Sequence, residues 1–235
     1  MPSTITQEQA EAIRDYFAGV ETIPADLGTK EAACSIAGIN LALSGELTDT
    51  TPECMSRVVG RWIIGVQDAM PAAMRNSQEW RNLLPLAAGT GRHAESERAA
   101  LIMDWMWGAV LTYCRPTADA RGYGAAWAMM CQERTVASAN AAARAARAAR
   151  DTYAAAAAID AANAAADAAA AAAYAAAAAT AAAYAATAAA YAADAAAYDA
   201  SASASAAAFA ARDTYAAAAW EHFAPAGVLV RLIAI

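Results

Sequence analysis

Apolar residues recur at helical spacing through the first half of the chain, between clear turn signals. The strongest example follows Thr51–Pro52, which we predict as an N-cap with proline at the first helical position. Pro71 ends this segment. Its apolar residues form one stripe that we expect to be buried: Met55, Val58, Val59, Trp62, Ile63, Val66 and Met70. No segment alternates β-branched and polar residues as a strand would, so the pattern predicts an all-α protein.

Two further helices are predicted before this one. The first runs to about Phe17 from a cap at Thr4 or Thr6, and the second begins at Thr29 and ends before Gly45. Both carry apolar residues at helical spacing.

Two more helices are predicted after it. A short helix covers about Ser77–Leu84, and residues 84–92 are predicted to be a loop with two glycines. A long buried helix follows and ends at Arg115–Pro116. It carries Leu101, Met103, Trp105, Met106 and Leu111.

The second half of the chain is dominated by alanine. No Gly or Pro occurs from 125 to 224, and Ala fills 35 of the 50 positions from 151 to 200. Alanine has the highest helix propensity, so helix is predicted throughout. A single rod would be roughly 145 Å long at 1.5 Å per residue. We therefore expect three or four packed helices, with breaks near 159–163, 180–187 and 201–205.

Tyrosines punctuate this tract at regular intervals. Tyr184, Tyr191 and Tyr198 are seven residues apart, which is a heptad rhythm. They mark either the face that touches larger residues of the first half or an aromatic-lined groove that binds a ligand. The nine residues 149–157 return as 211–219, which predicts equivalent places on two separate helices.

The change in composition predicts the domain organisation. Residues 1–123 form an N-terminal helical bundle, and 124–223 form several long Ala-rich helices packed with it. Residues 224–235 form an apolar C-terminal segment, either a strap across the core or a subunit interface. The alternative is one continuous domain.

Charge and cysteine content exclude some classes of protein. The net charge of −7 opposes binding to nucleic acid or to an anionic membrane. Residues 168–193 carry no charge, but alanine gains little in lipid, so no membrane span is expected. The four cysteines have no CxxC spacing and no signal peptide precedes them, which indicates reduced thiols in the cytoplasm.

One loop could bind an anion. Two glycines with neighbouring arginine and histidine could hold a phosphate or carboxylate on backbone N–H groups. A tight turn explains the glycines equally well, and the spacing and lysine of a Walker loop are missing. The candidate binding residues here are Gly89, Thr90, Gly91, Arg92 and His93.

Charged residues beside the Trp-containing helices are the second candidate group. Arg61, Asp68 and Asp104 are surface residues, members of internal ion pairs, or the lining of a pocket. With two histidines and no EF-hand or Glu-x-x-His pattern, we predict no metal site and no cofactor. Cys54, predicted in the first turn of its helix, is either a thiol of lowered pKa or a structural cysteine.

Three short blocks carry a resemblance to known proteins. They are PECMSRVVGRWIIGVQDAMP, LLPLAAGTGR and LIMDWMW, within residues 52–107. Their Pro-x-Cys-x-Ser-x-Val-Ile, Gly-Thr and Asp-Trp pattern resembles a group of uncharacterised helical bacterial and phage-borne proteins. The Ala-rich half is similar to tails of candidate bacterial immunity proteins. The resemblance implies a mobile-element or defence context and no catalytic role.

Together these patterns favour a non-enzymatic helical binding protein. Its partner would be a protein or a small anionic ligand, held where the bundle meets the Tyr-bearing helices. The alternatives are an enzyme with a site near Gly89–His93 and a structural oligomerisation module. A homo-oligomer is compatible with each.

Overall fold

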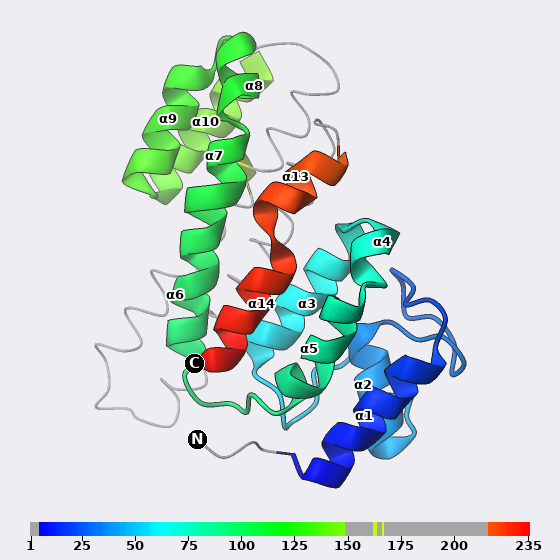
Figure 1. The fold of residues 1–235 in the computed structure, drawn as a ribbon. Helices are drawn as coiled ribbons and strands as arrows, with labels where there is room; N and C mark the ends of the chain where they lie inside the picture. Colours follow the sequence, from blue (N-terminus) through cyan, green and yellow to red (C-terminus); the bar gives the residue numbers. More distant parts are fainter. Residues whose placement is uncertain (1–4, 149–161, 164–165, 167–215) are drawn as a thin grey trace, which may run out of the picture.

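The computed structural model describes residues 5–148, 162–163, 166 and 216–235 (Figure 1). The described residues form helices and no strand, apart from an isolated bridge between Gly28 and Ala33, so the prediction of an all-α protein is confirmed. Within these residues, no helix has the length and apolar character needed to cross a bilayer.

The helices follow one another with short connections. They are α1 (Gln7–Gly19), α2 (Ser35–Ser44), α3 (Arg57–Ala69), α4 (Ala72–Arg75), α5 (Gln78–Ala88), α6 (Glu95–Trp105), the π-helix η1 (Met106–Val110), α7 (Leu111–Tyr113), α8 (Arg115–Ala120), α9 (Gly124–Glu133), α10 (Val136–Ala148), α13 (Ala216–Phe223) and α14 (Pro225–Ala234).

Two predicted helix ends are confirmed at the level of hydrogen bonds. Thr6 caps α1, because its Oγ1 accepts from the N–H of Gln9 at 3.2 Å while the Gln9 side chain accepts from Thr6 N–H at 2.9 Å. Gly45 ends α2 in the left-handed conformation, with φ of 76°.

Two predicted helix starts are wrong. Helix α3 is capped by Ser56 rather than Thr51, since Ser56 Oγ accepts from Val59 N–H at 3.2 Å. Helix α2 is capped by Cys34 rather than Thr29. The preceding residues turn back at Gly28, and Cys34 N–H donates to Leu27 O at 3.2 Å. Because this bond belongs to the turn, the helix cannot begin before Cys34.

Helix α5 is longer than predicted and α9 is shorter. Helix α5 continues through Pro85 to Ala88, because burial of its apolar side, which includes Leu84 and Ala87, outweighs the hydrogen bond that proline removes. The sequence predicts helix from residue 125 as far as about residue 159, but α9 ends at Glu133, because Arg134 adopts a left-handed φ of 53°. Of the predicted breaks in the Ala-rich tract, only residues 162–163 are described, and both are helical.

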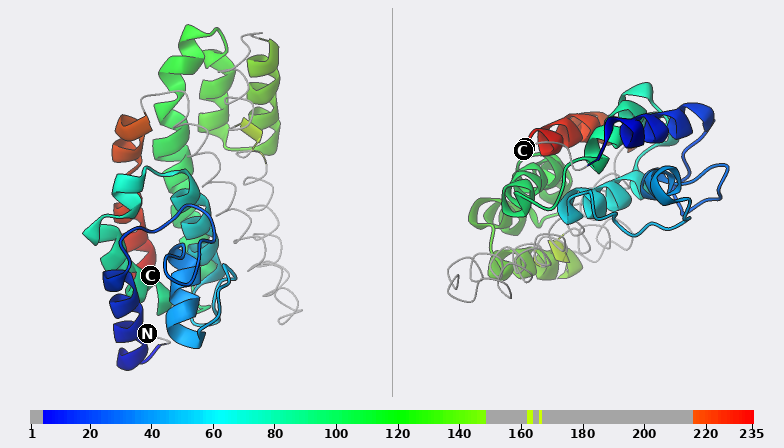
Figure 2. Two further views of the ribbon diagram at one scale, coloured as in Figure 1. Left: turned by 90° about the vertical axis from the view of Figure 1, so that its right-hand side faces the viewer. Right: turned by 90° about the horizontal axis from the view of Figure 1, so that it is seen from below.

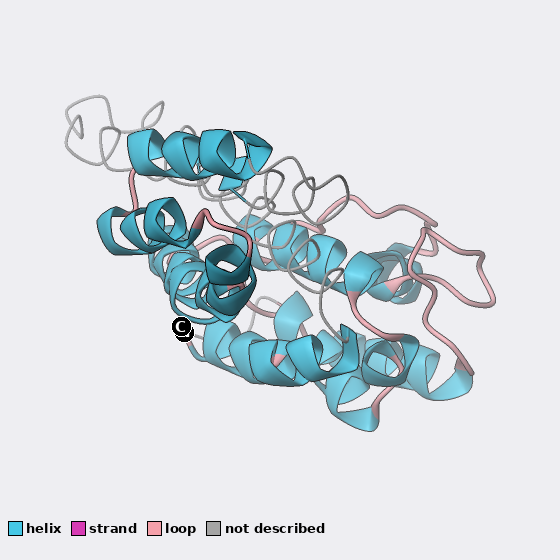
Figure 3. Cartoon of the chain, turned by 90° about the horizontal axis from the view of Figure 1, so that it is seen from above, coloured by secondary structure: helices cyan, strands magenta, loops and turns pink. Residues whose placement is uncertain are grey.

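The long helices form two layers that pack face to face. One layer contains α1, α5 and α14, and the other contains α2, α3 and α6, as the view from below shows (Figure 2). The axis of α6 continues through η1 and α7, and α8, α9 and α10 gather around its far end (Figures 1 and 3). One hydrophobic cluster runs through all of these elements.

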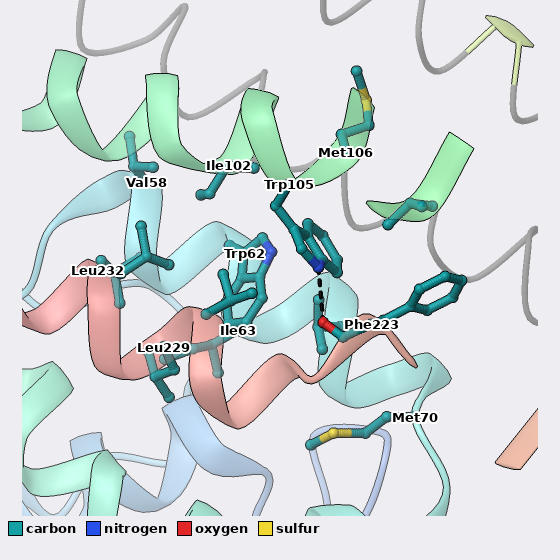
Figure 4. Packing of buried hydrophobic residues seen from close by; sticks show 14 of the residues in the cluster. Val58, Trp62, Ile63, Met70, Ile102, Trp105, Met106, Phe223, Leu229 and Leu232 are labelled. Carbon is teal, nitrogen blue, oxygen red and sulfur yellow. Dashed lines mark hydrogen bonds between the residues drawn. The ribbon is translucent and has the colours of Figure 1, made fainter. Parts of the chain in front are cut away.

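Tryptophans fill the centre of this cluster (Figure 4). The predicted stripe of α3 is confirmed, because each of its members is at most 2% exposed. Trp62 meets Trp105 edge to face at a centroid distance of 5.6 Å. No described residue accepts a hydrogen bond from the buried indole N–H of Trp62. In Figure 4 this nitrogen lies on the side of Trp105, where the ring offers a weak π acceptor.

The C-terminal segment completes the same core. Helix α14 packs against α3, α5 and α6, with Val228, Leu229 and Leu232 buried. Just before it, Trp105 Nε1 donates to Phe223 O at 2.8 Å (Figure 4). Residues more than 100 positions apart therefore share one interior.

Candidate functional site

The predicted Gly89–His93 loop connects α5 to α6 and lies against the start of α3. Thr90 is buried, and its hydroxyl donates to Ala87 O at 2.7 Å and accepts from Ser56 N–H at 3.0 Å. Gly91 N–H donates to Cys54 O at 2.8 Å. These bonds fasten the loop to the segment that precedes α3.

A carboxylate of the protein itself occupies the N-terminus of α3. Glu95 accepts from Ser56 Oγ at 2.6 Å, from Arg57 N–H at 2.9 Å and from Val58 N–H at 3.2 Å. Free N–H groups at a helix start form a natural anion site. Here Glu95, which is 9% exposed, provides the anion.

A buried arginine holds the other side of the loop. Arg98 is 1% exposed and donates to carbonyl oxygens of Thr90 at 3.2 Å, His93 at 2.5 Å and Leu232 at 3.0 Å. Desolvation lowers the pKa of this guanidinium, and the nearby carboxylate of Glu95 opposes that shift. The bond to Leu232 ties the loop to α14.

Arg92 and His93 lie nearer the surface. Arg92 Nη2 is 3.3 Å from Glu53 Oε1, in an ion pair whose glutamate is almost fully exposed. The loop thus has its buried polar groups bonded within the protein, while Arg92 keeps a partly solvated guanidinium. Binding of an external anion there stays a prediction.

The second candidate group is spread over the surface. Arg61, Asp68 and Asp104 are all exposed. Asp104 Oδ1 is 3.3 Å from Arg134 Nη1. Partial desolvation raises the pKa of Asp68, and hydrogen bonding from Gln67 opposes this. Tyr184, Tyr191 and Tyr198 lie outside the described residues.

Cys54 does not have the environment of a nucleophile at a helix start. Because α3 begins at Arg57, Cys54 precedes the cap residue Ser56 and lies outside the first turn. Burial raises the pKa of its thiol, which is the opposite of helix-dipole activation.

A cavity that the sequence did not reveal lies between two parts of the chain. Its volume is about 510 Å³, within the range of small-molecule sites. The first wall comes from the end of α3, α4 and the start of α5, and the second from α13 and the start of α14 (Figure 1). The lining residues are Met70, Ala73, Met74, Ser77, Glu79, Trp80, Trp220, Glu221, Ala224, Pro225, Ala226 and Gly227.

Local structure explains how the second wall turns around this space. Ala224 links α13 to α14 in a left-handed conformation, with φ of 46°, which is strained for a residue with a Cβ. The bond from Trp105 to Phe223 O fixes this corner. Trp220 and Glu221 therefore face the cavity from one side of the turn, and Ala226 and Gly227 from the other.

The first wall is held by capping and by a buried indole. Ser77 Oγ accepts from Trp80 N–H at 3.1 Å and so caps α5. Trp80 Nε1 donates to Ser35 Oγ at 3.1 Å. Because the indole N–H bonds to Ser35 and the side chain is 1% exposed, Trp80 backs the cavity with ring carbon atoms and with no polar group.

The lining is suited to binding. Its described residues include no His, Cys, Lys or Arg, and the ionisable side chains among them are Glu79 and Glu221. Among the described residues, no group of three or more His, Cys, Asp or Glu side chains could hold a metal ion. None of the predicted site residues that the structure describes lines the cavity.

Comparisons with protein-family models, with curated proteins and with solved structures found no match to this chain. The resemblance to phage-borne and immunity proteins stays a prediction.

Proposed function

We propose that this protein is a non-enzymatic binding protein that holds a small molecule in the cavity between α4–α5 and α13–α14. The observation that carries the proposal is the cavity itself, with a volume of about 510 Å³ and a mostly apolar lining. Ligand sites combine such a lining with a few polar groups that orient the ligand. Here the polar side chains are those of Ser77, Glu79 and Glu221.

The chemistry of the lining supports binding over catalysis. Acid–base and nucleophilic mechanisms need a nucleophile or a proton-transfer group held by a partner of matched pKa. The hydroxyl of Ser77 already serves as a helix cap, and no histidine or cysteine accompanies it in the lining. At the alternative enzyme site near Gly89–His93, the buried hydroxyl of Thr90 is bonded to backbone groups, and the nearby carboxylate of Glu95 is bonded to the start of α3.

A cavity-filling substitution tests the proposal. Gly227 lines the cavity and is exposed, and among the described residues a Cβ at this position would approach only Ala224 Cβ, at 4.0 Å. Gly227→Trp should therefore fold and fill the space. The matched control is Val230→Trp, at an exposed position of α14 that does not line the cavity.

The probe is tryptophol, a neutral indole alcohol, titrated into full-length protein with ¹³C-methyl methionine. Met70 and Met74 line the cavity and should shift, whereas exposed Met129 of α9 should not. The shifts should persist in Val230→Trp and vanish in Gly227→Trp. Unchanged methyl signals in the native protein, or equal shifts in both variants, would contradict the proposal.

Binding of an external anion at the Gly89–His93 loop is a separate prediction, and a substitution of Arg92 tests it. Inorganic phosphate should raise the melting temperature of the native protein but not of Arg92→Ala if the loop binds it. The same rise in both proteins would exclude this site. A protein partner, a homo-oligomer and a cytoplasmic location remain predictions, and light scattering tests the second of these.

A further inference from the structure

We infer that the ligand of this cavity is an organic cation with an apolar body, such as an aromatic or alkyl amine. This inference rests on the proposed function and adds the chemical class of the ligand. Three observations lead to it: the charge of the lining, its apolar surface and the absence of a basic side chain among the described residues of the lining.

Each wall contributes one carboxylate. Glu79 lies in the first turn of α5, and Glu221 lies in α13 on the other wall. Both side chains are exposed, and neither has a hydrogen bond or ion pair with a described residue. A ligand between the walls therefore meets two negative groups that have no partner within the described protein.

The arginines nearest to Glu79 in sequence do not pair with it. Arg75 donates to Ile23 O at 2.8 Å, Gln67 O at 2.9 Å and Met70 O at 2.8 Å. Arg81 is likewise engaged with carbonyl oxygens, including Val20 O at 2.7 Å. Both guanidinium groups are engaged with backbone carbonyls, and neither arginine belongs to the lining, whose described residues carry no positive side chain.

Two helix starts also border the cavity, and their partial charge is positive, opposite to that of the carboxylates. The N-terminus of α14 has no side-chain cap, and that of α5 is capped by Ser77. Each helix start carries the equivalent of about half a positive charge. Two full carboxylates exceed that sum, and the C-terminal end of α13 adds a further partial negative charge, so the field in the cavity favours a cation.

The apolar lining selects an organic cation over a metal ion. Hard metal ions need several oxygen ligands, and two carboxylates on separate walls do not supply them. Trp80 and Trp220 form the buried backing of the lining, since each is 1% exposed. The apolar surface that a ligand meets comes from Ala224, Ala226 and the half-buried Met74, whose side chain adapts to the body of the ligand.

Three probes with the same indole body separate charge from shape. They are tryptamine, a cation; tryptophol, a neutral alcohol; and indole-3-propionate, an anion. Each is titrated at low salt into full-length protein, with the methyl signals of Met70 and Met74 as the readout. We expect tryptamine to bind about tenfold more tightly than tryptophol, and indole-3-propionate to bind most weakly.

Substitutions of the two glutamates assign the effect. Glu79→Gln and Glu221→Gln should each weaken tryptamine binding by about fivefold and leave tryptophol unchanged. The matched control is Glu97→Gln, at an exposed glutamate of α6 that does not line the cavity, which should alter neither affinity.

The outcomes distinguish the two proposals. Equal affinities for the three probes, with all binding lost in Gly227→Trp, would overturn the cation and leave the binding function intact. Tighter tryptamine binding that survives both glutamine substitutions would also overturn the cation at this site. No binding of any probe would overturn both proposals.

Discussion

The two-layered bundle and helix α10 both bury one face of their helices, but the buried side chains differ in size. Helix α9, which packs against α10, buries the large side chains of Trp127 and Met130. The bundle buries Trp62, Trp80 and Phe17, with many Ile, Val and Met side chains around them. The face that α10 buries consists of small residues: Ser138, Ala139, Ala142, Ala143 and Ala146. Large side chains gain more from leaving water, while alanines gain mainly from close contact and helix propensity.

The two regions also differ in how polar side chains fix their geometry. In the bundle, Arg81, Glu95 and Arg98 bond to backbone groups of distant segments. At the start of α10 the capping bonds between Thr135 and Ser138 are local, with Ser138 N–H donating to Thr135 Oγ1 at 3.2 Å, although Trp127 of α9 donates to the more distant Leu111 O at 2.8 Å. Side-chain shape and direction therefore specify the bundle, whereas the buried face of α10 depends on how closely its neighbours approach.

The largest expected effect is loss of a central tryptophan. Trp62→Ala removes a side chain that is 0% exposed and should lower the free energy of unfolding by about 3–5 kcal/mol, through lost burial and the cavity that remains. Urea denaturation followed by circular dichroism measures this. Ala146→Gly, at a buried site of α10, should lower it by only about 1 kcal/mol. Similar losses in the two variants would remove the contrast between the regions.

The next effect tests the long-range polar bonds of the bundle. Glu95→Ala leaves the Ser56 hydroxyl and the N–H groups of Arg57 and Val58 without their acceptor, so stability should fall by about 2–4 kcal/mol. The control is Glu97→Ala, at an exposed glutamate two residues along the same helix, which should change stability by less than about 0.5 kcal/mol. A loss under 1 kcal/mol for Glu95→Ala would show that water replaces the carboxylate.

A smaller effect tests close approach in the α9–α10 pair. Ala142 is 0% exposed, so Ala142→Leu should overpack the interface and destabilise by about 1–3 kcal/mol. Ala137→Leu, on the exposed side of the same helix, should change stability by less than about 0.5 kcal/mol. Equal unfolding midpoints for the two variants would mean that α10 is not held closely against its neighbours.

The same contrast explains how much of the fold the sequence predicts. The stripe from Met55 to Met70 is predictable, since large apolar residues at helical spacing are compatible only with the buried side of a helix. The start of α3 is not, because Thr51 and Ser56 are both plausible caps and Glu95, 39 residues from Ser56, completes the cap that forms. The break at Arg134 is equally difficult to predict from the sequence. An arginine in the left-handed conformation has no local sequence signal comparable to glycine.

The candidate site was less predictable than the fold. The cavity unites Trp80 with Trp220 and Glu79 with Glu221, pairs about 140 residues apart whose meeting depends on where α14 packs. The glycines near Arg92 predict an anion-binding loop, although the sequence gives no sign that buried Glu95 and Arg98 fix the structure around it. Helical spacing reveals which side of a helix is buried, but it does not reveal which distant wall faces it.

The smallest expected effect at neutral pH concerns Cys131 in α9. Burial raises the pKa of its thiol to about 11, against an ordinary value near 9, while Arg115 and Arg134 oppose the shift. At pH 8.5 the folded protein should therefore hold about 100-fold less thiolate at this site than an unfolded chain, and iodoacetamide should label it correspondingly slowly. Mass spectrometry of the labelled peptide gives the rate.

The sign of the linked pH effect follows from the same shift. Between pH 9 and about 11 the unfolded thiol ionises while the folded thiol stays protonated, so stability falls as pH rises through this window and is unaffected at pH 7. Cys131→Ser should remove that part of the decline. If Cys131 is labelled as fast as an unfolded peptide while buried Cys34 of the bundle stays protected, the thiol reacts through local opening. The α9–α10 pair then opens independently of the bundle.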